Sequence, residues 1–263
     1  MSRKQGERLI AKDILSSNKD ALFFDQFYKN QLKWTKSTRK YIYRKINLLE
    51  SKIILEVGSG TGALLEELVD ITDGINVIGL DINIIALEYC RTNNHHRVIH
   101  GDGNFLPFQD NNIDIVICNY LLLWLNNPVQ VLKEFSRITK PGGWVVCLAE
   151  PDYKGRQDQP YGDIWKKLYY SSLSAPGPDV GRKLKQIFSK ANLEAEIGLQ
   201  SIPQVSNAAK EMYEDEIRSL ERFIPTDSYD LLKKIKKLIA KTNISEMKLF
   251  MPVYYAFAKK RKN

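Results

Sequence analysis

The stretch "IILEVGSGTGALLEEL", residues 53–68, constrains the fold more than any other part of the chain. An apolar run ends at Val57, glycines follow at positions 58, 60 and 62, and an amphipathic run then begins. Glycine adopts backbone dihedrals that other residues avoid, so this spacing predicts a tight turn between a strand and a helix. Such a turn brings free N–H groups and the positive end of a helix dipole close to a ligand. We therefore expect a ligand site here, with a tight turn that holds no ligand as the alternative.

Strand-like and helix-like runs alternate around and after this turn. Buried strands are expected at 52–57, 76–81, 97–102, 113–120 and 143–150. Helices are expected at 62–70, 83–93 and 127–139, the last with Asn127 as its cap and Pro128 in its first turn. Alternation of helices with nearly continuous apolar strands predicts an α/β fold, in which a parallel sheet has helices on both faces.

The two ends of the chain differ from this central part. Residues 1–50 are expected to be helical, and residues 151–182 are rich in Pro, Gly, Asp and Tyr. Beyond them the pattern predicts a helix at 181–193, a strand at 194–202, helices at 205–223 and 227–242, and an apolar strand at 250–260. Because the sequence contains no repeat and no low-complexity linker, we expect residues 1–263 to form a single domain with helical additions.

An acidic residue ends the second predicted strand. Asp81 follows Gly58 by 23 residues, where a carboxylate can accept two hydrogen bonds from a ribose diol. This spacing favours an adenosine-type ligand. Gly58, Gly60 and Ala63 also satisfy the dinucleotide fingerprint, whose last position accepts alanine, so a dinucleotide remains an alternative.

Four motifs in order resemble those of the class I S-adenosylmethionine-dependent methyltransferases, and most of all the type 11, ubiquinone- and menaquinone-biosynthesis-like branch. They read "LEVGSGTG", "GLDIN", "GDGNFLPFQDNNIDIVICNYLLLWL" and "ITKPGGWVVCLAEPD", and they cover about 100 residues, 53–150. The resemblance implies a Rossmann-like sheet of seven mostly parallel strands, with the strand at 250–260 antiparallel beside the fifth and 194–202 at the edge. It also implies S-adenosyl-L-methionine as cofactor and S-adenosyl-L-homocysteine as product.

The resemblance assigns cofactor contacts to motif positions. Asp81 suits the ribose, Ile82 an adenine face, Asp102 and Gly103 the adenine edge, and Glu56 the ammonium. Asp102 as a turn cap and Glu56 as an ordinary strand-end carboxylate are the alternatives. Arg39 is a candidate partner for the methionine carboxylate, with a solvated arginine as the alternative. The full set of expected cofactor residues is Glu56, Gly58, Ser59, Gly60, Gly62, Asp81, Ile82, Asp102, Gly103, Asn104, Asn119, Tyr120 and Arg39.

Candidates for contact with the methyl acceptor follow the fourth and fifth strands. They are Trp124, Glu150, Asp152 and Tyr153, with packing as the alternative for Trp124. No residue is assigned as a general base, and the scattered histidines and cysteines complete no metal set. Within the single domain, 1–50 is then a helical cap, 51–150 the cofactor-binding core, and 151–263 the acceptor-side insertions with the final strands.

The acceptor itself is less constrained than the cofactor. The fourth motif reads "NYLL", without the prolines of amino-methylating nucleic-acid enzymes, so a small-molecule acceptor is the first expectation. The net charge of +8 keeps a protein or RNA acceptor as the alternative, together with a non-catalytic cofactor-binding protein of this fold. Single cysteines and the absence of an apolar run of about 18 residues predict a cytoplasmic protein without a transmembrane segment.

Overall fold

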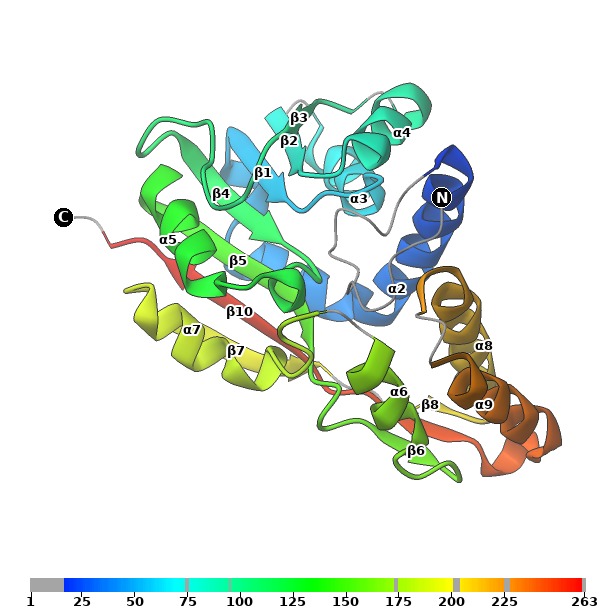
Figure 1. Cartoon of the computed structure of the whole chain (residues 1–263). Helices are drawn as coiled ribbons and strands as arrows, with labels where there is room; N and C mark the ends of the chain where they lie inside the picture. Colours follow the sequence, from blue (N-terminus) through cyan, green and yellow to red (C-terminus); the bar gives the residue numbers. More distant parts are fainter. Residues whose placement is uncertain are drawn as a thin grey trace.

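The computed structural model describes residues 17–73, 76–94, 96–172, 175–200, 204–224 and 228–261 (Figure 1). The predicted N-terminal helical segment is confirmed from Asn18 onward as helix α2, Asn18–Lys45, whereas residues 1–16 lie outside the described part. Helix α2 begins where Ser17 Oγ accepts a hydrogen bond from the backbone N–H of Asp20, at 3.2 Å.

A seven-stranded sheet with the order β3-β2-β1-β4-β5-β10-β7 forms the centre of the molecule. Its strands are β1 Ile53–Val57, β2 Asn76–Asp81, β3 Val98–His100, β4 Ile113–Cys118, β5 Thr139–Pro151, β7 Ala195–Gln200 and β10 Val253–Lys259. Strand β10 runs antiparallel to both β5 and β7, and the other pairs are parallel. The predicted insertion of the last strand beside the fifth, with the 194–202 strand at the edge, is confirmed.

Helices cover both faces of this sheet, as predicted. Helix α2 lies on one face together with α3 (Ala63–Thr72) and α4 (Ile84–Asn94), and the other face carries α5 (Pro128–Ile138) and α7 (Leu184–Lys190). Alternate residues of β1 enter the two cores, Ile54 the first and Leu55 the second. Among the residues that the structure describes, no helix is long and apolar enough to cross a membrane.

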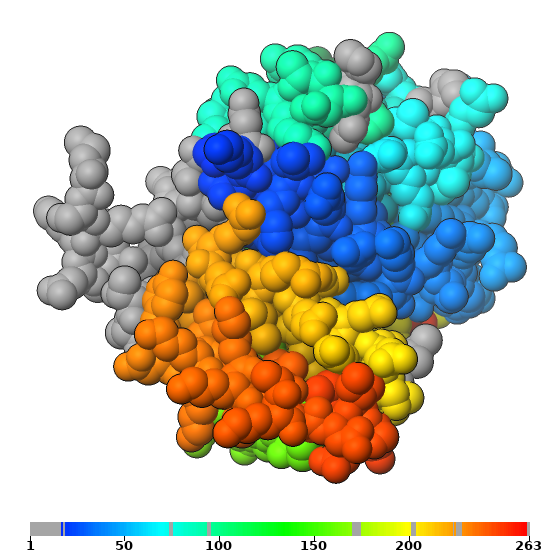
Figure 2. Space-filling view, turned by 90° about the vertical axis from the view of Figure 1, so that its right-hand side faces the viewer, coloured from blue at the N-terminus to red at the C-terminus, as the bar shows by residue number. Residues whose placement is uncertain are grey.

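The segments after β5 build a second unit of structure, in which the helices predicted at 205–223 and 227–242 are confirmed, whereas its small sheet and its first helix were not predicted. A small sheet of order β6-β9-β8 packs with three helices around an aromatic core. We call these segments the lid: β6 Gln157–Gln159, α6 Ile164–Ser172, β8 Gln204–Val205, α8 Ser206–Phe223, α9 Tyr229–Lys241 and β9 Lys248–Phe250. The strand expected at 250–260 is confirmed as β10, whereas β9, which precedes it, was not predicted. Figure 2 shows α2 running across one face of the molecule between α3 and α4 and the lid helices α8 and α9.

The connection after β4 is held by one buried carboxylate. Glu150, near the end of β5, accepts hydrogen bonds from the backbone N–H groups of Leu121, Leu122 and Leu123 at 3.0, 2.8 and 3.3 Å. Leu122–Trp124 form a short 3-10 helix, so these bonds satisfy N–H groups at the start of that turn. The side chain of Glu150 therefore fixes the backbone that carries Trp124.

Replacement of Glu150 by glutamine should destabilise the fold. An amide offers one acceptor oxygen, and its NH2 group would face a backbone N–H, leaving that buried donor without a partner. Burial raises the pKa of Glu150 to about 8, so the comparison is made at pH 9, where the carboxyl is ionised. There we expect the free energy of unfolding in urea to fall by about 1–3 kcal/mol. Glu88→Gln, an exposed position on α4, is the matched control and should stay within about 0.5 kcal/mol of the parent protein. Equal effects of the two substitutions would show that the three hydrogen bonds contribute nothing.

Candidate functional site

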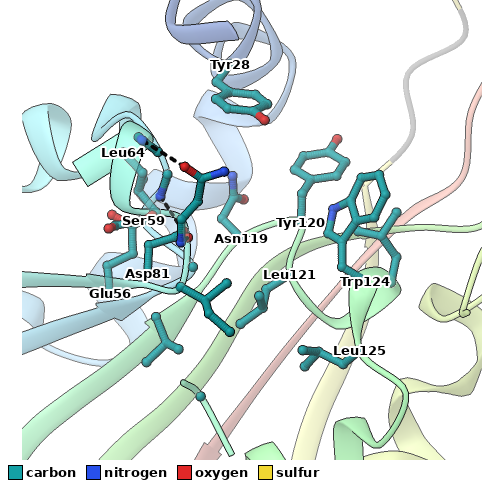
Figure 3. A pocket seen from close by; sticks show the side chains of 18 of the residues that line it. Tyr28, Glu56, Ser59, Leu64, Asp81, Asn119, Tyr120, Leu121, Trp124 and Leu125 are labelled. Atoms are coloured by element: carbon teal, nitrogen blue, oxygen red, sulfur yellow. Dashed lines mark hydrogen bonds between the residues drawn. The ribbon is translucent and has the colours of Figure 1, made fainter. Parts of the chain in front are cut away.

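A cavity of about 420 Å³ lies beyond the carboxyl ends of β1, β2 and β4, and helix α2 covers it from the other side. We call it the main cavity (Figure 3). Polar side chains from the strand ends gather in one part of the view, and Tyr120 and Trp124 stand in another. Its position is the one that a parallel α/β sheet offers to ligands.

The glycine-rich turn has the backbone conformation that the sequence predicts. Gly58, Gly60 and Gly62 have φ angles of +78°, +53° and +91°, in the left-handed region that side chains disfavour. A Cβ atom on Gly58 would lie 2.8 Å from Leu121 Cδ1, and one on Gly62 would lie 2.5 Å from Cys90 Sγ. Gly58 and Gly60 line the main cavity, whereas Gly62 caps helix α3 and does not line it.

Asp81 is fixed at the rim of the main cavity. Its carboxylate accepts hydrogen bonds from the backbone N–H groups of Gly60, at 2.7 Å, and Asn83, at 2.8 Å. Burial raises the pKa of this carboxyl, and the backbone donors act in the opposite direction. The neighbouring Ile82 lines the cavity with 46% of its surface exposed, so it offers an apolar face to a ligand.

Three buried acceptor atoms near this rim lack donors within the described part of the chain: Glu56 Oε2, Ser59 Oγ and Asn119 Oδ1. All three residues line the main cavity. Glu56 is only 2% exposed, and burial together with the nearby charge of Asp81 raises the pKa of its carboxyl well above the usual value. A buried carboxyl oxygen without a donor is costly, so this corner favours a ligand that brings a positive charge or several N–H donors.

The loop after β3 supplies another edge of the cavity. Asp102 Oδ1 accepts hydrogen bonds from the backbone N–H and from the side-chain Nδ2 of Asn104, each at 2.8 Å. Asp102, Gly103 and Asn104 all line the main cavity, as does Ile82 across from them. The three residues expected at an adenine, Ile82, Asp102 and Gly103, thus line one cavity together with Asn104.

Helix α2 contributes residues that the sequence analysis missed. Phe24, Phe27, Tyr28, Gln31 and Trp34 line the main cavity at spacings of three or four residues, which places them on one face of the helix. In Figure 3 the ring of Tyr28 lies above the polar residues of the strand ends. The aromatic periodicity was visible in the sequence, but an ordinary amphipathic helix packed on a core has the same pattern.

Four aromatic side chains, together with leucines of the connection after β4, line the remaining wall of the main cavity. Tyr120 and Trp124 come from the connection after β4, and Tyr153 and Tyr169 come from the segments after β5. The rings of Tyr153 and Tyr169 stack with centroids 4.3 Å apart. Glu216 of α8 also lines this wall, although no pattern in the sequence distinguished it from other helical glutamates.

Two predicted acceptor-side acids do not reach the cavity. The Glu150 carboxylate accepts hydrogen bonds from the backbone N–H groups of Leu121–Leu123, and burial raises its pKa to about 8. Asp152 accepts hydrogen bonds from the N–H groups of Lys154 and Gly155, and Arg182 Nη2 lies 2.6 Å from its Oδ2. Both carboxylates hold backbone in place, so Trp124 and Tyr153 are the predicted acceptor-side residues that the structure brings together.

Arg39 also lies away from the main cavity. Its side chain is 1% exposed and its guanidinium donates from Nε to Glu67 Oε1 at 2.9 Å and from Nη1 to the carbonyl of Leu32 at 2.6 Å. A further ion pair joins Nη2 to Glu67 Oε2. With its donors occupied inside the protein, the guanidinium offers no support for the predicted pairing with a ligand carboxylate.

Comparisons with known proteins show which family this chain belongs to. Residues 55–147 match the family model described as a methyltransferase domain. A demethylmenaquinone methyltransferase of Staphylococcus saprophyticus is 30% identical over 168 residues, covering 61% of this chain and 66% of the relative. The enzyme of the same name from Geobacillus stearothermophilus is 30% identical over 171 residues, covering 62% of this chain and 68% of the relative.

The fold comparison agrees. A protein of Anabaena variabilis, described as a methyltransferase from an antibiotic biosynthesis pathway, superposes with a TM-score of 0.62 at 16% identity, over 83% of this chain and 95% of that one. This likeness concerns the fold alone. Taken with the sequence relatives and the matched domain, it leads to one conclusion: the chain belongs to the class I S-adenosylmethionine-dependent methyltransferases, in their ubiquinone- and menaquinone-like branch.

Proposed function

We propose that the main cavity holds S-adenosylmethionine at its polar end and a small, flat, hydroxylated ring molecule at its aromatic end, to which the enzyme transfers a methyl group. The observation that carries this proposal is the division of one cavity into buried acceptor atoms without donors and a wall of aromatic rings. Glu56, Ser59 and Asn119 suit the cofactor ammonium, Asp81 the ribose diol, and Ile82 with Asp102–Asn104 the adenine.

The reaction needs alignment more than acid or base strength. When bound, the cofactor supplies a methyl group on a positively charged sulfur that leaves as a neutral thioether. The acceptor's electron pair forms the new bond to the methyl carbon as the carbon–sulfur pair returns to sulfur, and the acceptor loses a proton to solvent. The protein orients the two reactants and excludes water, and such positioning lowers a barrier by up to about 7–11 kcal/mol.

The aromatic wall supports a ring-shaped acceptor. Tyr120, Trp124, Tyr153 and Tyr169 present flat apolar faces, and stacked or edge-on rings attract one another beyond their buried area. The relatives are named for demethylmenaquinone, a molecule with a quinone ring, which agrees with this lining. A quinol-type ring, with hydroxyl groups that donate electrons to the ring, is the acceptor class we propose.

A protein or RNA acceptor is the competing proposal, because the chain carries a net charge of +8. Incubation with methyl-labelled cofactor and fractionated lysate separates the two. We expect the label in the fraction of small, solvent-extractable molecules. Label that enters only protein or RNA would contradict the proposed acceptor class and leave the cofactor site untouched.

Replacement of Asp81 by asparagine should weaken cofactor binding. The substitution removes the charge that accepts hydrogen bonds from the ribose, and such bonds contribute about 1.5–3 kcal/mol. Calorimetry should show S-adenosylhomocysteine binding about 10- to 150-fold more weakly than in the parent protein. Asp70→Asn, an exposed carboxylate on α3, is the matched control and should leave the affinity unchanged.

The same titrations with NAD test the alternative ligand. The parent protein should bind S-adenosylhomocysteine far more tightly than NAD, since an anionic pyrophosphate would lie near the buried carboxyl of Glu56. Tighter binding of NAD, or an Asp81→Asn protein with parental affinity and parental unfolding temperature, would overturn the proposed cofactor site.

Replacement of Tyr153 by alanine should separate binding of the cofactor from transfer. Tyr153 belongs to the aromatic wall and packs on the core of the lid, so the affinity for S-adenosylhomocysteine should stay within about threefold, or ~0.7 kcal/mol. Methyl transfer should fall by at least about 100-fold, because a misplaced acceptor loses its alignment. Tyr229→Ala, at a tyrosine on α9 that lines neither cavity, should retain full transfer. Equal losses of affinity and transfer in Tyr153→Ala would place this ring in the cofactor site instead.

A further inference from the structure

A second cavity, of about 320 Å³, adjoins the main cavity on its aromatic side. We call it the side cavity. The two share five lining residues, which are Gln31, Trp34, Tyr120, Tyr153 and Glu216. No residue of the glycine-rich turn lines the side cavity, and its other walls include Met212, Leu249 and Val253 from the lid and from β10. A molecule that extends beyond the methyl-transfer position therefore has room on this side, away from the cofactor.

Glu216 occupies the junction of the two cavities. It is 7% exposed, and among the described residues it is the one carboxylate that lines both of them. Arg156 clamps it through two parallel hydrogen bonds, Nη1 to Oε1 and Nη2 to Oε2, each at 2.7 Å. Two-point pairing of this kind fixes the position of a carboxylate as well as its charge.

Arg156 is itself fully buried and held rigidly. The rings of Trp165, Tyr169 and Tyr213 lie 4.8, 5.2 and 5.9 Å from its guanidinium carbon. Its Nε donates to both oxygens of Asp158 at 2.8 and 2.9 Å. Asp158 is also buried but lines neither cavity. The guanidinium thus joins one carboxylate inside the lid to another that faces the cavities.

The cluster of Arg156, Asp158 and Glu216 has more positions that can accept a hydrogen bond than Arg156 fills. One guanidinium faces two carboxylates, which leaves a negative charge uncompensated when both are ionised. Burial raises the pKa of Asp158 to about 6, as expected where buried carboxylates share one cation. A carboxylate offers about four lone-pair positions. Arg156 occupies two of those on Glu216, and the Tyr169 hydroxyl also hydrogen-bonds to this carboxylate. A hydrogen-bond donor at the junction would meet the position that remains.

We propose that Glu216 anchors the methyl acceptor by accepting a hydrogen bond from a hydroxyl group on it, so that the reacting ring lies against the aromatic wall and the rest of the molecule extends into the side cavity. This inference rests on the proposed function and adds the residue that selects the acceptor. A hydroxylated ring donates to the carboxylate. A ring bearing only carbonyl or ether oxygens places lone pair against lone pair and is excluded.

The binding of two probes to the parent protein tests directly whether the site selects a hydroxylated ring. The probes are 2-methyl-1,4-naphthohydroquinone, which has two hydroxyl groups, and its dimethyl ether, which has none. Both are titrated without oxygen in the presence of S-adenosylhomocysteine, with the fluorescence of Trp34 and Trp124 as the signal. The hydroquinone should bind at least about 10-fold more tightly than the ether, the fold-change expected for a hydrogen bond to a charged acceptor.

Two isosteric variants then test whether Glu216 causes the preference for the hydroquinone. Glu216→Gln and Asp158→Asn each remove one negative charge from the same buried cluster, but only the first alters a cavity wall. Glu216→Gln should lose most of the preference for the hydroquinone, raise the acceptor KM more than it lowers kcat, and leave the affinity for S-adenosylhomocysteine within about threefold. Asp158→Asn should keep the parental preference. Glu216→Asp, which keeps the charge on a shorter side chain, should recover part of it.

The outcomes separate this inference from the proposed function. Equal binding of both probes by the parent protein overturns the anchoring role while the ring acceptor stands. Equal loss of preference in Glu216→Gln and Asp158→Asn assigns Glu216 a merely structural role and also overturns it. Binding of neither probe by the parent protein, with the cofactor bound normally, overturns the ring acceptor and the anchor together.

Discussion

A parallel sheet must be covered on both faces, and the rest of this structure depends on that constraint. Its strands are joined by crossover helices, so the carboxyl ends of β1, β2 and β4 all open at one edge. The backbone at that edge is tied down locally. The N–H of Gly58 donates to the carbonyl of Leu80 at 2.7 Å, and the N–H of Gly60 donates to Asp81. A rigid, polar floor for the main cavity follows from the way the sheet is built.

The lid is organised by a different interaction, the buried pairing of Arg156 with two carboxylates. A buried ion pair repays its desolvation only when its geometry is good, and here the guanidinium is fully engaged and enclosed by aromatic rings. The pairing connects β6 to α8 across the aromatic core of the lid. One network therefore gives the lid its shape and sets Glu216 at the boundary of the two cavities.

Much of the cofactor side was predictable because it is encoded locally. Positive φ angles at Gly58 and Gly60, an acid at the end of β2 and a turn after β3 each need only a few neighbouring residues. The places of β10 beside β5 and of β7 at the edge were also predictable, because the four motifs resemble those of a family with this topology. The small sheet β6-β9-β8 was not predictable, because its strands have only two or three residues each and carry little strand pattern.

The carboxylates in the second half of the chain show what could not be predicted from the sequence. Glu150, Asp152 and Glu216 are all carboxylates in the second half of the chain, and position after β5 favoured the first two. Packing turned Glu150 and Asp152 toward backbone N–H groups and left Glu216 facing the cavities. The sequence by itself determined the sheet, the glycine turn and the family, since these depend on local backbone conformation and hydrophobic periodicity. Only the tertiary structure decided which carboxylate faces the two cavities, because that depends on which buried donors each side chain meets after folding.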